Sequence, residues 1–253
     1  MLKKFLNAYW KSLAFFTLTG VIGGFFSGLY LLDSYPAEMQ QQILAQGLDR
    51  TALGIVSAVQ SALYGLLLGA IGIVLAKRIG LWKEKLCFEK KPLLAAAMVS
   101  LAAGLALILL DVFFFSKFSP AIAETYLVKP SIPFILASVT YGAVIEEVMM
   151  RLFLMSLIAF VLHRLFGKGR EYPADAVLIT ANVIAALLFS AGHLPATAAM
   201  MGITPMILLR CFLLNGGIGL LFGRLYRKHG LQYAMLAHGG CHVVSKAIWL
   251  LFL

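Results

Sequence analysis

Long apolar runs with almost no charged residues are the feature of this sequence that most restricts its fold. A helix that crosses the hydrocarbon core of a bilayer needs about 20 mostly apolar residues, and lipid offers no water to satisfy open backbone groups. Such runs span residues 12–32, 51–76, 93–110, 131–162, 177–194, 204–222 and 231–253. The sequence therefore predicts an all-α fold, a polytopic membrane helical bundle with seven transmembrane helices in one domain, 1–253. The run 131–162 is longer than one span needs, which leaves an eighth helix open.

The overall composition agrees with a membrane protein and excludes other classes. Of the 253 residues, 61% are hydrophobic and 13% are charged, whereas soluble domains carry roughly 25% charged residues. Sparse charge with abundant apolar residues excludes a disordered chain. Three cysteines are too few for a disulfide-stabilised scaffold. We therefore expect a multi-pass protein of the cell membrane.

Basic residues are distributed unevenly between the two sides of the predicted bundle. Three precede residue 12, six lie in 77–91, three in 164–170 and three in 224–228, whereas the other connecting segments together hold three. Cytoplasmic loops are enriched in Lys and Arg, so this alternation predicts an odd number of spans with the N-terminus inside. The formal net charge of +10 then belongs to a surface that faces anionic lipid. We expect the lipid bilayer as a partner and no nucleic acid.

Two glutamates and an arginine lie near the middle of the run 131–162. On a helix, Glu147 and Arg151 are four residues apart, so they share a face and can pair. Glu146 points away from Arg151 by roughly 140° at 100° per residue. We expect Glu146 to face a cavity, where a cation such as Arg151 or Arg210 would keep its carboxylate ionised. The alternative is a structural salt-bridge cluster that locks two helices together.

Histidines in two later runs are further costly polar residues inside the predicted membrane region. His193 shares a helix face with Phe189, four residues before it. His238 and His242 share a face of the last run, where their imidazoles can donate hydrogen bonds to a developing oxyanion. The same pair is half of a zinc-binding helix motif, although the glutamate that follows the first histidine in that motif is absent. Packing is the alternative for all three histidines.

The neighbours of the last two histidines have simpler interpretations. Cys241 is a candidate thiol nucleophile, but a cysteine inside a membrane usually behaves as a small apolar residue. Lys246 either continues the stripe of His238 and His242 or extends outward to the membrane surface.

The glycine-rich stretch 215–223 is expected to form a close-packing surface.

Three motifs in order resemble the signature of a known family. Glu-Glu-x-x-x-Arg stands at 146–151, Phe-x-x-x-His at 189–193 and His-x-x-x-polar at 238–242. The stretch from Asn215 up to the last motif is also similar. Together they resemble the CAAX protease and bacteriocin-processing (CPBP) family of intramembrane proteases, related to the Ras-converting CAAX prenyl endopeptidases. The resemblance covers about residues 131–250, so 131–253 is expected to be a protease-like core, and 1–130 holds spans without a signature.

The resemblance implies an intramembrane endopeptidase whose substrate is a membrane-associated or lipidated peptide, such as a C-terminal CAAX-like sequence. The implied catalytic residues are polar side chains of three helices: Glu146, His193, His238 and His242. In this arrangement Glu146 activates water with the assistance of His193, and the other two stabilise the oxyanion. Glu147 and Arg151 are implied to be structural support.

The last motif position departs from the family, which usually has Asn or Asp where this chain has His242. A neutral imidazole still donates one N–H, so an oxyanion role survives. Family members have been described both as metalloproteases and as glutamate-dependent, metal-free proteases. In the metal-dependent alternative, zinc would be held by Glu146, His193, His238 and His242.

Two other functions stay open at the level of sequence. A non-catalytic membrane scaffold or bacteriocin self-immunity protein would use the same polar core for packing. A proton-coupled transporter would use buried Glu and His residues as a relay, although the chain lacks paired broken spans in two matching halves.

The predicted site also requires particular helix geometry. With straight spans, the depths of Glu146, His193 and the last two histidines differ by roughly 10–15 Å at 1.5 Å per residue. The spans must therefore tilt or break, for example at Pro195 or at Gly239-Gly240.

Overall fold

The computed structural model describes residues 2–84, 86–167 and 169–253, and none of these residues forms a strand. Lys85 and Lys168, two of the basic residues that predict the inner face, lie outside the described residues. The elements in chain order are α1 (Leu2–Ser34), α2 (Ala37–Ala45), α3 (Arg50–Leu63), η1 (Tyr64–Leu68), α4 (Gly69–Arg78), α5 (Lys90–Phe113), η2 (Phe115–Lys117), α6 (Pro120–Thr125), α7 (Ile132–Ala137), η3 (Ser138–Glu146), η4 (Val148–Met155), α8 (Ser156–Phe166), α9 (Asp175–Met201), α10 (Pro205–Cys211), η5 (Phe212–Gly217), α11 (Ile218–His229) and α12 (Leu231–Phe252). The predicted all-α fold is confirmed for this part of the chain.

Within the described residues, six helices are long and apolar enough to cross a membrane: Lys3–Ser34, Arg50–Arg78, Lys90–Lys117, Asp175–Met201, Pro205–His229 and Leu231–Phe252. A further helix, 132–166, runs without interruption through α7, η3, η4 and α8, and it carries Glu146, Glu147 and Arg151 near its middle. These helices support a multi-pass membrane protein. The number of seven or eight spans and the location of the N-terminus inside stay predictions.

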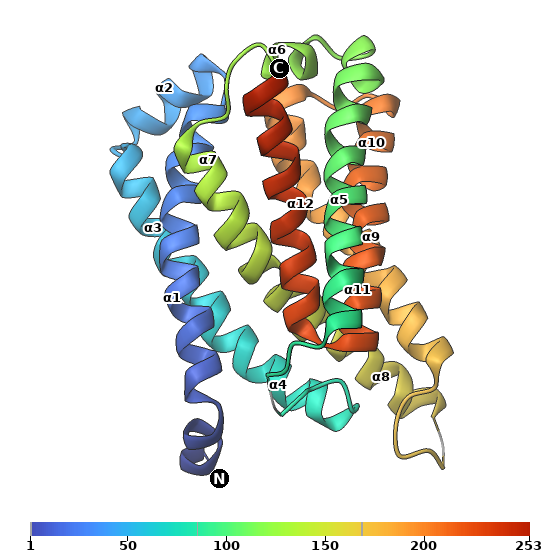
Figure 1. Cartoon of the computed structure of the whole chain (residues 1–253). Helices are drawn as coiled ribbons and strands as arrows, with labels where there is room; N and C mark the ends of the chain where they lie inside the picture. The colour runs from blue at the N-terminus through green and yellow to red at the C-terminus, as the bar shows by residue number, and fades with distance from the viewer. Residues whose placement is uncertain (1, 85, 168) are drawn as a thin grey trace.

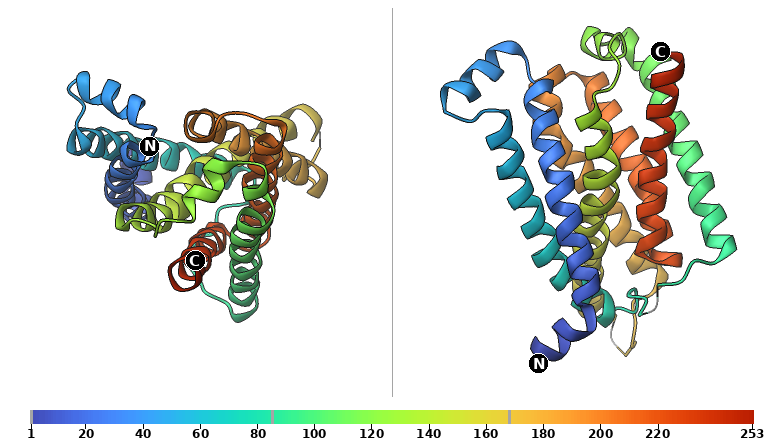
Figure 2. Two further views of the ribbon diagram at one scale, coloured as in Figure 1. Left: turned by 90° about the horizontal axis from the view of Figure 1, so that it is seen from above. Right: turned by 60° about the vertical axis from the view of Figure 1, so that its left-hand side comes forward.

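The helix 132–166 crosses the bundle obliquely between two groups of helices (Figures 1 and 2). Its η3 part packs on α1 and α12, and its η4 part packs on α4 and α9. On either side, α1 packs along α3 and α12 packs along α5. No break occurs at the expected positions, because α9 continues through Pro195 and α12 continues through Gly239 and Gly240. The sequence required the spans either to tilt or to break, and in the structure the helix 132–166 is tilted.

The two termini lie at opposite ends of the bundle (Figure 1). The N-terminus, the end of α4 and α8 lie at the lower end in that view, whereas α2, α6 and the C-terminus lie at the upper end. The basic segments before residue 12, after α4 and after α8 therefore share one end. This arrangement agrees with the alternation of charge along the sequence.

Large apolar side chains cover the outward faces of the helices. Leu18 of α1, Val59 of α3 and Met98 of α5 are each more than half exposed. Soluble monomers rarely expose large contiguous apolar surfaces, whereas contact with lipid requires them. The buried core lies instead around the helix 132–166, the central helix of the bundle, where Ile145, Val148 and Leu152 are fully enclosed.

The glycine-rich stretch 215–223 packs closely against its neighbours, as predicted. A Cβ atom at Gly219 would lie 2.9 Å from Nη2 of Arg151, and one at Gly223 would overlap the side chain of Asn182. Small residues of this kind let helices approach closely in membranes. The backbone of η5 and α11 therefore lies within reach of the central helix and of α9.

A second set of glycines joins α1 to α3. Gly20, Gly24 and Gly28 are spaced four residues apart on α1, and a Cβ atom at any of them would overlap the backbone of α3. This small-residue stripe is a typical contact surface between membrane helices. It explains how two long helices lie side by side over most of their length.

We expect Gly24→Ala to lower the free energy of unfolding by about 2 kcal/mol, because the added methyl group forces two backbones apart. Thermal unfolding in detergent measures the effect. Gly192→Ala is the matched control, since a Cβ atom there meets nothing within 4 Å. Equal melting temperatures for the two variants would contradict the close α1–α3 contact.

Candidate active site

A buried ion pair anchors the polar residues of the central helix. Nη1 of Arg151 donates to Oε1 of Glu147 over 2.8 Å, and both side chains are almost completely buried. The pair expected from the four-residue spacing is therefore present, although η3 and η4 are π-helical rather than α-helical.

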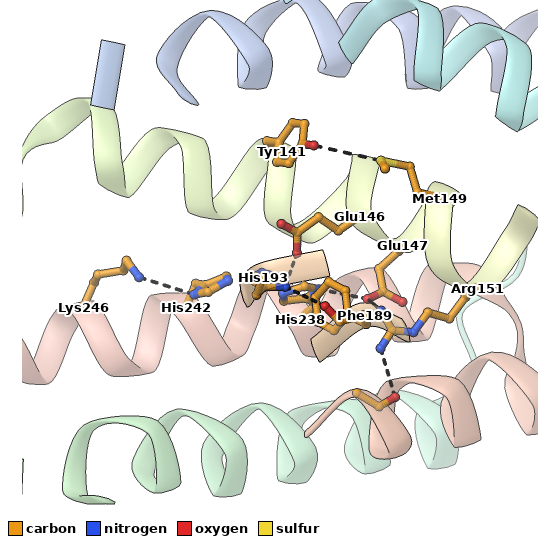
Figure 3. A network of polar contacts seen from close by, with 11 residues as sticks. Tyr141, Glu146, Glu147, Met149, Arg151, Phe189, His193, His238, His242 and Lys246 are labelled. Atoms are coloured by element: carbon orange, nitrogen blue, oxygen red, sulfur yellow. Dashed lines mark hydrogen bonds and ion pairs between the residues drawn. The ribbon is translucent and has the colours of Figure 1, made fainter. Parts of the chain in front are cut away.

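The guanidinium of Arg151 connects three helices (Figure 3). Its Nη2 donates to the carbonyl oxygen of Gly219 on α11 over 3.0 Å. Its Cζ lies 5.0 Å from the ring centroid of Phe189 on α9 and 5.6 Å from that of Phe222 on α11. Aromatic faces attract cations at such distances, so this side chain holds α9 and α11 against η4.

His238 on α12 is oriented by the same glutamate (Figure 3). Its Nδ1 lies 2.8 Å from Oε1 of Glu147, and a carboxylate paired with an arginine accepts, so Nδ1 donates. The imidazole stacks on Phe222 with a centroid distance of 4.6 Å. Its Nε2 is left facing Oε2 of Glu146 at 3.8 Å. Glu147 therefore fixes which ring nitrogen of His238 faces Glu146.

His193 on α9 is oriented by its own helix. Its Nδ1 lies 2.8 Å from the carbonyl oxygen of Phe189, one turn earlier, and its ring contacts the ring of Phe189 edge-on at 4.5 Å. A carbonyl oxygen only accepts, so Nδ1 carries the proton. A neutral His193 therefore presents a lone pair at Nε2, which can accept a proton from water.

His242 lies one turn after His238, and the two ring centroids are 5.0 Å apart. Nδ1 of His242 is 3.3 Å from Nζ of Lys246. A Cβ atom at Gly142 would lie 3.2 Å from Nε2 of His242 and 3.8 Å from Nε2 of His238. The absence of a side chain at Gly142 therefore leaves room beside both Nε2 atoms.

The four residues implied by the sequence line one cavity of about 360 Å³. They come from three helices, with Glu146 on the central helix, His193 on α9, and His238 and His242 on α12. The Glu146 side chain is 20% exposed, and its carboxylate accepts no hydrogen bond from any described residue. This carboxylate is available to bind a water molecule.

The cations expected beside Glu146 are engaged with other carboxylates. Arg151 pairs with the adjacent glutamate. Arg210 lines the cavity, but its Nε donates to Oδ1 of Asp111 over 2.7 Å, and Tyr126 donates to the other oxygen of that aspartate over 3.0 Å. The nearest ionisable neighbour of Glu146 among the ion pairs of the described residues is an imidazole.

Sequence reasoning missed one ion pair and one glycine that shape the site. The Asp111–Arg210 pair joins α5 to α10, and the only signal in the sequence is that both charges stand in or beside apolar runs. Gly142 carries a weaker signal, a glycine one turn before Glu146. Cys241 lines the cavity but is 99% buried, as expected of a small apolar residue.

The residues do not form a zinc site. Within the described ranges, no three His, Cys, Asp or Glu side chains lie close enough together to hold a metal ion. We therefore derive no step that passes through a metal.

Residues 128–244 match the family described as Type II CAAX prenyl endopeptidase Rce1-like. The matched segment contains the whole central helix and all residues of the cavity motifs. No match was found among curated proteins or among solved structures. The match over residues 128–244 supports the CAAX protease and bacteriocin-processing family that the sequence motifs resemble. The family and the apolar helices together support a membrane endopeptidase of the CAAX type.

Replacement of Arg151 by Met should lower the free energy of unfolding by about 3–5 kcal/mol, because the Glu147 carboxylate is left buried without its cation. Thermal unfolding in detergent measures the loss. The control Arg50→Met breaks an exposed pair with Asp33 and should cost about 1 kcal/mol or less. Equal effects of the two substitutions would mean that the buried pair is not structural support.

Proposed function

We propose that the protein is an intramembrane endopeptidase that hydrolyses a peptide bond near the C-terminus of a lipidated, CAAX-like peptide. The observation that carries the proposal is the shared cavity, in which the Glu146 carboxylate and three imidazoles, contributed by three helices in all, meet inside an apolar bundle. Ionisable groups are costly in such surroundings. Their convergence on one cavity is what hydrolysis of a buried substrate requires.

Water activation is assigned to Glu146 with His193. A carboxylate that accepts no protein hydrogen bond can take a proton from a water molecule as general base. His193 supports this role, because its Nε2 presents a lone pair toward the cavity that both residues line. The activated water then attacks the substrate carbonyl, and the proton passes to the leaving amine.

Stabilisation of the oxyanion is assigned to His242, which donates from Nε2 as a neutral ring, and to His238, which donates from Nε2 only in its doubly protonated form because Nδ1 holds the proton of the neutral ring. Their Nε2 atoms lie beside Gly142, where the missing side chain leaves space for a substrate oxygen. Hydrogen-bond donors held in place before the reaction stabilise a developing negative charge without reorganisation. Glu147 orients His238 and is itself held by Arg151, so we infer that this pair supports the site as well as the fold.

The size and lining of the cavity support a short peptide segment as substrate. Its volume of about 360 Å³ lies at the small end of the range of ligand pockets. A few residues of peptide fill such a space, and a long lipid chain does not fit beside them. The lipid group would therefore lie against the apolar outer surface, in the bilayer.

Glu146→Gln, His193→Ala and His238→Ala should each reduce cleavage by at least about 100-fold while the protein still inserts and folds. The assay uses purified protein in liposomes with a prenylated CAAX peptide, and mass spectrometry identifies the products. Glu124→Gln, an exposed carboxylate on α6, is the matched control. Unchanged turnover in all three variants would overturn the mechanism, and no product from the unsubstituted protein would favour a non-catalytic scaffold.

Gly142→Ala tests the oxyanion space directly. The new methyl group would lie against Nε2 of both His238 and His242, so we expect kcat to fall by about tenfold or more through loss of oxyanion contacts. The melting temperature should change little, because the methyl group enters a cavity rather than a packed contact. Turnover equal to that of the unsubstituted protein would contradict the location of the oxyanion.

A further inference from the structure

Lys246 is a buried ammonium group that the mechanism above does not use. Its exposed fraction is only 7%, and no carboxylate pairs with it among the ion pairs of residues 2–84, 86–167 and 169–253. Burying a cation in an apolar bundle is costly. The contacts that Lys246 makes therefore indicate why it is there.

Two contacts hold this ammonium group in place, and Figure 3 shows the one with His242. Its Nζ lies 3.3 Å from Nδ1 of His242, one turn earlier on α12, and 4.2 Å from the ring centroid of Phe134 on α7. Phe134 stacks on Tyr30 at 4.3 Å and contacts Trp249 edge-on at 6.1 Å. Lys246 therefore lies between an aromatic cluster and the imidazole, behind His242 as seen from the cavity.

The contact determines which nitrogen of His242 carries the proton. An ammonium group has three donors and no acceptor, so Nδ1 of His242 must accept. A neutral imidazole has one N–H and one lone pair. The proton of neutral His242 therefore lies on Nε2, the nitrogen that faces the space beside Gly142.

The other two imidazoles of the cavity have the opposite arrangement. Nδ1 of His193 faces a carbonyl oxygen and Nδ1 of His238 faces a carboxylate, and both partners accept. When these two rings are neutral, each presents a lone pair at Nε2. His242 is the imidazole of this cavity that offers an N–H in its neutral form.

We propose that Lys246 is a positioning residue that holds His242 in the Nε2–H tautomer, which makes His242 a hydrogen-bond donor to the oxyanion. This inference rests on the proposed peptidase function. It assigns to Lys246 a role exerted entirely through the imidazole, with no contact to substrate.

A double-substitution experiment separates this role from simple packing. In the unsubstituted background, Lys246→Met should lower kcat by about tenfold through loss of an aligned oxyanion donor, with KM little changed because the donor acts in the transition state. In a His242→Asn background, the side-chain amide always carries N–H donors and needs no tautomer control. There Lys246→Met should leave the activity of the His242→Asn parent unchanged. Lys246→Arg, which also donates and never accepts, should retain most of the activity in the unsubstituted background.

An equal loss from Lys246→Met in both backgrounds would overturn the proposal, because that result marks a packing role. The proposed function would still stand if Glu146→Gln abolishes the same cleavage. If the unsubstituted protein cleaves nothing, the proposed function fails and the oxyanion role of Lys246 fails with it.

A spectroscopic measurement tests the tautomer without any need for activity. Nitrogen-15 NMR of histidine-labelled protein in lipid bilayers distinguishes protonated from unprotonated ring nitrogens, and the His242→Asn spectrum identifies the signals of that residue among the five histidines. We expect the Nε2–H form in the unsubstituted protein and a mixture of tautomers in Lys246→Met. An Nδ1–H form in the unsubstituted protein, or no change on substitution, would overturn the proposal even if the His242→Asn enzyme is too slow to assay.

Discussion

The cost of burying charge in an apolar bundle governs both the fold and the site. Arg151 and Glu147 are almost wholly enclosed, and an ion left without its partner there costs several kcal/mol. Each therefore depends on the other, and Arg151 also needs the Gly219 carbonyl and two aromatic rings from neighbouring helices. Because the same carboxylate holds Nδ1 of His238, one interaction joins the packing of the central helix to the geometry of the cavity.

The chemistry of the cavity depends on which group contacts Nδ1 of each imidazole. His193 meets a carbonyl oxygen, His238 a carboxylate and His242 an ammonium group. Acceptors fix a proton on Nδ1, and a donor fixes a lone pair there. As neutral rings, His193 and His238 therefore present a lone pair at Nε2, whereas His242 presents an N–H. In the proposed peptidase, the lone pair of His193 accepts a proton from water, and the N–H of His242 donates to the oxyanion.

The parts of this structure that were predictable depend on near neighbours in the sequence or on the solvent. Apolar runs must be helical in lipid, and residues four apart share a helix face, so the helices and the Glu147–Arg151 pair followed directly. The pairing of Asp111 with Arg210 was not predictable, because α5 and α10 are distant in the chain. The four-residue spacing of His242 and Lys246 allowed their contact, but the sequence equally allowed the lysine side chain to extend to the membrane surface.

The amino-acid sequence by itself therefore determined the class of fold, the motifs of the family and the set of polar residues that an apolar bundle has to accommodate. It did so because hydrophobicity and helical spacing are local properties. Only the tertiary structure decided that Glu146, His193 and the histidines of α12 line one cavity, since their depths along straight helices differ. The oblique course of the helix 132–166 reconciles those depths, and that course is set by close contacts with α1, α4, α9 and α12, which no single segment encodes.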